Sequence, residues 1–183
     1  MSFIRYFISI FLLTGCTILP IEHYSKSKID KNIKKLSIMI RGLDKRVDKK
    51  EAEDLAKSGI YYALELAKKY RVVSPPLWHN TLVNLGLRDR GLCYQWAEDM
   101  LLFFLKKRYR TLKFYFVGAD IGDYFEHNGV VVSFGDFRDG IILDAWRNSG
   151  NLYFNYVKKD RYIWKNREEI YKKVEYRLTI TDN

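Results

Sequence analysis

The segment "GLCYQWAEDMLLFFLKKRYRTLKFYFVG", residues Gly91 to Gly118, contains the change of pattern that decides the fold. In its first half the apolar residues recur at three- and four-residue steps, which is typical of one helix face: Trp96, Ala97, Met100, Leu101, Phe104 and Leu105. After Arg110 the period becomes two, and aromatic and β-branched residues dominate, as in a strand. The segment therefore predicts a helix that starts near Leu92 and is followed by a β-strand.

Helical patterns also precede this segment. Residues 44–70 gather small and apolar side chains on one face: Ala52, Leu55, Ala56, Gly59, Ala63, Leu66, Ala67 and Tyr70. Ser74-Pro75-Pro76 interrupts the pattern, because proline lacks the amide donor and restricts the residue before it. We expect a second, short helix from about Pro76 to Leu85, ending at Gly86.

Several short runs of period two follow the segment. They cover residues 112–118, 126–134, 140–147 and 151–157, with Arg147–Gly150 as the loop of a hairpin. The tail from Tyr162 mixes a charged, partly helical piece with a last strand near Val174–Ile180. Helices first and antiparallel strands later predict an α+β domain, in which N-terminal helices pack on an antiparallel β-sheet.

The composition fits one folded domain. The chain has 183 residues, of which 48% are hydrophobic and 16% aromatic, and these values exclude a disordered protein. Its formal net charge is +10, which favours contact with anionic surfaces. The lysines are scattered without a run of five, so we expect a solvated surface and no nucleic-acid partner. The sequence does not specify an oligomeric state.

The N-terminus "MSFIRYFISIFLLTGC" combines Arg5 with an apolar run from Phe7 to Leu13 and then Thr14-Gly15-Cys16. The run is too short to span a bilayer core of about 30 Å and has the length of a signal-peptide core. Its ending resembles the lipobox of bacterial lipoproteins. This resemblance implies that a peptidase removes residues 1–15 and that Cys16 carries lipid at a membrane. The alternative is a buried N-terminal helix with a chance cysteine.

Three parts of the chain follow from this interpretation. Residues 1–15 form the signal peptide, residues 16–43 form a lipidated, lysine-rich tether, and residues 44–183 form the α+β domain. Thr17 after the lipidated cysteine is compatible with sorting to the outer membrane, facing the periplasm. The expected location is the bacterial cell envelope.

Cys93 then has no disulfide partner, because the only other cysteine is Cys16. It lies in the first turn of the helix that follows Gly91, where the helix dipole favours a thiolate. A thiolate is the form of cysteine that acts as a nucleophile. The alternative is that Cys93 is a small buried apolar residue.

A nucleophilic thiol needs a base, and the chain has three histidines. His23 lies in the tether and His79 in the short helix, whereas His127 begins a strand, which holds a side chain rigidly. Asp144 interrupts the apolar run "IILDAW" of the next strand, where a carboxylate needs a hydrogen-bonding partner. His127 would supply that partner, although Asp144 could instead pair with Arg147 or Arg138.

Three motifs in this order resemble the transglutaminase-like branch of the papain-like cysteine enzymes. They are "GLCYQWA" around Cys93, "EHNGVVV" around His127 and "ILDAW" around Asp144. The resemblance implies a papain-like core with Cys93 as nucleophile, His127 as base and later acid, and Asp144 as the residue that orients His127. The Cys93 backbone amide is one candidate for the oxyanion hole. The nearest side-chain candidates are Asn84 and Trp78.

The same resemblance implies a membrane-anchored cysteine amide hydrolase or acyltransferase that acts on a peptide, a protein or a peptidoglycan peptide. One alternative is a non-catalytic envelope lipoprotein that uses this fold as a binding or scaffolding module. Another is a peptidoglycan peptidase of the NlpC type. No cofactor is expected. No metal site is predicted, because the sequence has no Cys-x-x-Cys or His-x-x-x-His pair.

Overall fold

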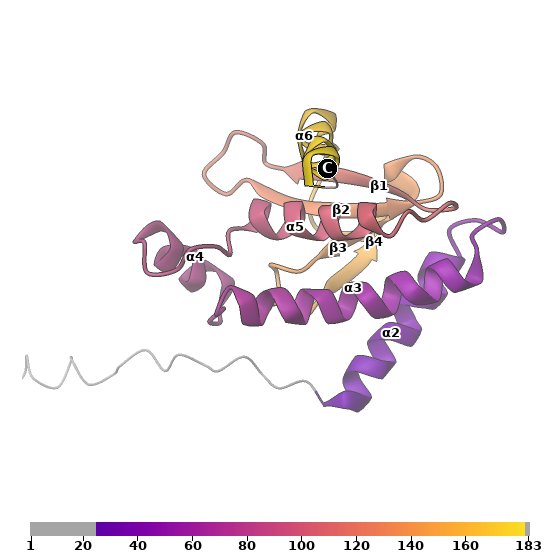
Figure 1. The fold of residues 1–183 in the computed structure, drawn as a ribbon, viewed down its shortest axis with the longest axis horizontal. Helices are drawn as coiled ribbons and strands as arrows, with labels where there is room; N and C mark the ends of the chain where they lie inside the picture. The colour runs from indigo at the N-terminus through magenta and orange to yellow at the C-terminus, as the bar shows by residue number, and fades with distance from the viewer. Residues whose placement is uncertain (1–24, 182–183) are drawn as a thin grey trace, which may run out of the picture.

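The computed structural model describes residues 25–181 (Figure 1). The predicted signal peptide, the predicted lipid attachment at Cys16 and the first part of the tether lie outside the described residues. Within the described part of the chain, no helix is both long and apolar enough to cross a bilayer.

Within residues 25–181, four α-helices precede the sheet and one follows it. The first four are α2 (Lys26–Arg41), α3 (Lys49–Lys69), α4 (Pro76–Asn84) and α5 (Cys93–Lys106). The strands are β1 (Lys113–Ala119), β2 (His127–Ser133), β3 (Ile141–Asp144), β4 (Tyr153–Tyr156) and β5 (Lys165–Asn166), with short 3-10 helices η1 (Phe137–Asp139) and η2 (Val157–Lys159). Helix α6 (Glu168–Thr181) ends the described chain. This arrangement confirms the predicted α+β class.

The five strands form one antiparallel sheet in the order β4-β3-β2-β1-β5. In the pairing of β2 with β3, Val130 lies opposite Leu143 and Val131 opposite Ile142. This register places the start of β2 beside the end of β3. His127 and Asp144, the first and last residues of these two strands, therefore lie at the same end of the sheet.

The two faces of the sheet are covered differently. Val130 and Val132 of β2 face the main core, which the helices complete, whereas Val131 belongs to a smaller cluster with Trp164 on the other face. Helix α5 packs directly on β1 and β2, α3 packs on α5, and α2 packs on α3. Figure 1 shows α2 as the outermost of these three helices and α6 on the opposite side of the molecule, near β1.

Helix α2 corrects the predicted tether. Residues 26–41 form a regular helix, and Leu36 and Ile40 are fully buried against the core. The lysines on the outer face hide the pattern of Ile29, Ile33, Leu36 and Ile40, whose spacing is that of a helix face. The folded unit therefore begins before residue 44.

Helix α3 begins five residues later than the pattern suggested. The side chain of Asp48 accepts hydrogen bonds from the backbone amides of Lys50, at 2.8 Å, and Glu51, at 2.9 Å. These bonds satisfy amide donors that have no partner within the helix, so Asp48 fixes the helix start.

The predicted last strand near Val174–Ile180 is wrong. Valine, tyrosine, leucine and isoleucine alternate there with polar residues, but the segment is the second half of α6. Ile170, Tyr171 and Val174 have helical spacing and pack on the main core, with Val174 fully buried. Packing on the core therefore favours a helix over a strand here. The fifth strand of the sheet is instead the short β5, which pairs with β1.

Candidate active site

Cys93 is the first residue of α5. Two features fix the chain just before it. The Gln95 side-chain oxygen accepts hydrogen bonds from the backbone amides of Gly91 and Leu92, at 2.7 and 3.0 Å. Gly91 has a φ of +134°, and a Cβ at this position would lie 2.1 Å from the His79 ring. The backbone therefore holds the thiol at a helix N-terminus, which favours negative charge.

The thiol of Cys93 is half-buried and unbridged, and it faces the start of β2. Its Sγ lies 3.6 Å from the Glu126 carbonyl oxygen, to which a thiol can donate. The Asn128 side-chain amide donates towards Sγ from 3.9 Å. An ionised sulfur thus has a hydrogen-bond donor close by.

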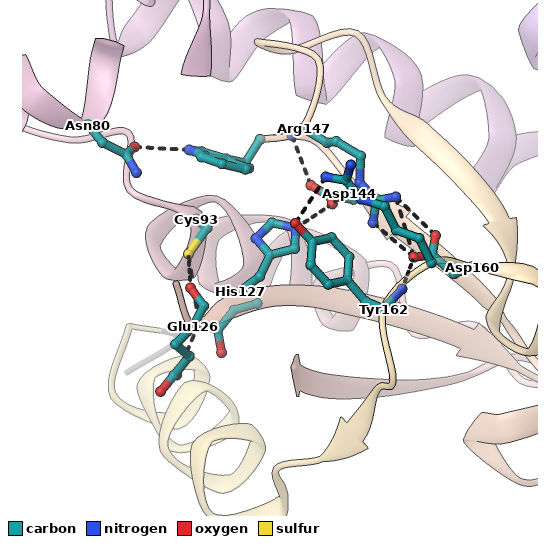
Figure 2. Close-up of polar contacts among 11 residues, drawn as sticks. Asn80, Cys93, Glu126, His127, Asp144, Arg147, Asp160 and Tyr162 are labelled. Carbon is teal, nitrogen blue, oxygen red and sulfur yellow. Dashed lines mark hydrogen bonds and ion pairs between the residues drawn. The ribbon is translucent and has the colours of Figure 1, made fainter. Parts of the chain in front are cut away.

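His127 and Asp144 are joined by a buried hydrogen bond. The distance from His127 Nε2 to Asp144 Oδ2 is 2.6 Å, and both side chains are almost completely inaccessible to solvent. Because Nε2 bonds to the carboxylate, Nδ1 is the nitrogen left for the thiol. Figure 2 shows the His127 ring between Asp144 on one side and Cys93 on the other.

The surroundings of His127 favour its charged form. Burial lowers the pKa of His127, but hydrogen bonds with Asp144 and Cys93, and the charges of both groups, outweigh burial and raise the pKa to about 9. The imidazole is therefore protonated at neutral pH.

Asp144 is the centre of a buried ion network. Its carboxylate accepts hydrogen bonds from the backbone amide of Arg147 at 3.0 Å and from Arg147 Nε at 2.9 Å, and Arg147 also pairs with Asp160 at 3.1 Å. Burial raises the pKa of Asp144, but the interactions with His127 and Arg147 lower it by more. The pKa of Asp144 is therefore below its usual value. Arg138, the other partner considered for Asp144, pairs with Asp136 instead. Asp144 thus binds both His127 and Arg147.

Three aromatic rings surround the His127 imidazole. The ring centroids of Trp146 and Tyr162 lie 4.9 Å from that of His127, and the Trp164 centroid lies 5.5 Å away. These contacts hold the imidazole in one orientation and keep water from the hydrogen bond with Asp144.

A cleft of about 530 Å³ opens over Cys93 and His127. Its walls come from α4, the start of α5, the loop between β1 and β2, Trp146, and the segment after η2. Of the two predicted oxyanion candidates, Asn84 lines this cleft. Trp78 is not among the lining residues and is 37% exposed.

Sequence reasoning missed Asn80, which also lines the cleft. Its side-chain oxygen accepts a hydrogen bond of 3.0 Å from Trp146 Nε1. This bond fixes which end of the amide carries the oxygen, and it leaves the NH₂ group of Asn80 as a donor. Figure 2 shows Asn80 on the same side of His127 as the Cys93 sulfur. The one signal in the sequence was the four-residue spacing between Asn80 and Asn84 on α4.

The described residues contain no group of three or more histidine, cysteine, aspartate or glutamate side chains arranged to hold a metal ion. Comparisons of the chain with protein-family models, with curated proteins and with solved structures found no match. The geometry of the site is therefore what indicates a function.

Proposed function

We propose that the protein is a cysteine-dependent amide hydrolase or acyltransferase of the transglutaminase-like, papain-like kind, with Cys93, His127 and Asp144 as its triad. One observation carries this proposal. The buried hydrogen bond between His127 and Asp144 leaves the second imidazole nitrogen towards a thiol at a helix N-terminus, inside an open cleft. These are the roles that base, orienting group and nucleophile need.

In the first half of the reaction, the Cys93 thiolate attacks the carbonyl carbon of an amide and forms a C–S bond. The carbonyl oxygen becomes an oxyanion. His127 then gives its proton to the leaving nitrogen, the C–N bond breaks, and the acyl group remains on Cys93 as a thioester.

In the second half, water or an amine attacks the thioester carbonyl and His127 takes the proton of that nucleophile. The C–S bond then breaks and the thiolate of Cys93 is restored. Water yields a carboxylic acid, and an amine yields a new amide. Asp144 keeps the imidazole oriented and stabilises its charge through both halves.

Two donors are available for the oxyanion. The backbone amide of Cys93, at the first position of α5, has no acceptor within the helix. The NH₂ group of Asn80, held by Trp146, faces the same cleft. We assign these two groups to the oxyanion hole, with Asn80 taking the role considered for Asn84 and Trp78.

The variant Asn80→Ala tests this assignment. We expect acylation of Cys93 by p-nitrophenyl acetate to slow by about 100- to 1000-fold, because one donor to the oxyanion is lost. Alkylation by iodoacetamide should stay unchanged, because that displacement forms no oxyanion. The two rates are measured on the full chain, and labelled peptides are assigned by mass spectrometry.

Asn84→Ala is the matched control, since it removes an amide from the same helix and cleft. It should leave both rates close to the wild-type values. Equal acylation rates in Asn80→Ala and the wild type would remove Asn80 from the oxyanion hole, and a large effect of Asn84→Ala would move the role there.

We further propose that lipid on Cys16 holds the domain in the cell envelope, at the outer membrane facing the periplasm, where peptides, proteins or peptidoglycan peptides are its substrates. The lipobox-like "LTGC" supports this location. The mass of the mature N-terminus from the native host tests it. An N-terminal peptide that begins at an unmodified Met1 would contradict it.

A further inference from the structure

The charged side chains on the walls of the cleft differ in whether another group compensates their charge. Besides His127, two charged side chains line it, Glu126 and Arg161. Glu126 forms an ion pair with Arg167 and accepts hydrogen bonds from the Gly122 backbone amide at 3.0 Å and the Asn128 side chain at 3.2 Å. Its negative charge is therefore already compensated within the protein.

Arg161 has no such compensation. Within residues 25–181 no carboxylate pairs with it; its guanidinium donates a hydrogen bond of 3.0 Å to the Tyr162 hydroxyl and lies 4.8 Å from the Tyr162 ring centroid. The Tyr162 ring in turn packs against the His127 imidazole. Among the described residues, the Arg161 guanidinium thus contacts the aromatic ring that packs on His127, and it lies at the edge of the cleft.

Part of the cleft lining is apolar and unusually exposed. Tyr124 and Phe125, on the loop before β2, are 93% and 70% exposed and contact each other edge to face at 5.0 Å. Leu77 of α4 is another exposed lining residue. Large apolar side chains that gather on the surface around a cleft mark a binding site.

From these walls we infer that the cleft binds acyl donors that carry a carboxylate close to the reacting carbonyl, with Arg161 binding the carboxylate and Tyr124 and Phe125 contacting an apolar neighbour. The inference rests on the proposed function of Cys93. A guanidinium fits a carboxylate with two parallel hydrogen bonds, and the exposed rings suit an apolar side chain. The substrate class is a peptide with an acidic residue or a free carboxyl terminus beside the scissile bond.

Two small reagents separate charge recognition from thiol reactivity. Iodoacetate and iodoacetamide undergo the same step, in which the sulfur forms a C–S bond and iodide leaves, but only iodoacetate carries a carboxylate. We expect Arg161→Gln to lower the ratio of the two rate constants at Cys93, iodoacetate over iodoacetamide, by about tenfold, as for the loss of one charge-assisted contact. The full chain is used and the labelled site is assigned by peptide mass spectrometry.

Arg41→Gln is the matched control, because it removes the same charge from the exposed end of α2. It should leave the ratio unchanged, which separates contact with Arg161 from net charge. Fast iodoacetamide labelling with the same ratio in Arg161→Gln and the wild type would overturn the inference while leaving the proposed function intact. Slow labelling by both reagents in the wild type would overturn the proposed function, and the inference with it.

Discussion

At pH 6, His127→Ala slows the alkylation of Cys93 by iodoacetamide by about a hundredfold or more. An ordinary cysteine thiol has a pKa of about 8.5, so well under 1% of it is ionised at this pH. In the proposed mechanism the protonated His127 ring stabilises the thiolate, and alanine removes that charge. The measurement is the second-order rate constant for loss of the free thiol, assigned to Cys93 by mass spectrometry.

The pH dependence of the two rate constants gives a second test. Because the pKa of His127 is about 9, its ring keeps its charge below that pH and loses it above. The rate advantage of the wild type over His127→Ala should therefore be present while the ring is charged and disappear above about pH 9, and the rate constant of His127→Ala should rise about tenfold per pH unit below the pKa of an ordinary thiol. A wild-type rate constant that rises as steeply as that of a free thiol would contradict the activated nucleophile. Asn84→Ala, in the same cleft, serves as the control variant.

Asp144→Ala has the largest expected effect on stability. It leaves Arg147 with Asp160 as its remaining carboxylate partner and His127 without its buried hydrogen-bond partner. Removing one member of a buried ion pair costs about 3–5 kcal/mol, because the groups that it bonded stay buried without it. For a chain of this size, the loss corresponds to a decrease in Tm of roughly 10 °C or more, measured by circular dichroism at pH 7.

Asp136→Ala provides the contrast. The Asp136–Arg138 pair is as short as the contacts of Asp144, at 2.8 Å, but both side chains face solvent. Water screens this pair, so its loss should leave Tm nearly unchanged. Similar Tm values for Asp144→Ala and the wild type would show that the buried network contributes little to the fold.

Local patterns in the sequence predicted the elements that carry Cys93, His127 and Asp144. Gly91 and the apolar spacing after Leu92 identified the helix that begins at Cys93, and period-two runs located the strands of His127 and Asp144. Strand register then brings the ends of β2 and β3 together. Because each of these features depends on neighbours in the sequence or on simple antiparallel pairing, the sequence was sufficient to predict them.

The missed features depend on contacts between distant segments. The helix of residues 26–41 is stabilised by burial of Leu36 and Ile40, which a lysine-rich sequence hides, and residues 174–180 are helical because Val174 packs on the main core. Asn80 is fixed by its hydrogen bond with Trp146, 66 residues away in sequence. Nothing in the sequence around either residue reveals that contact, so the sequence did not single out Asn80 among the polar residues of α4.

The mass of the intact protein during reaction with p-nitrophenyl acetate tests the central claim most directly. We expect one acetyl group to appear on Cys93 in the wild type and to be lost again as water completes the cycle. In His127→Ala the same adduct should form far more slowly. If acetyl groups appear only on lysines, or on Cys93 at equal rates in the wild type and His127→Ala, then Cys93 is not the nucleophile of a triad.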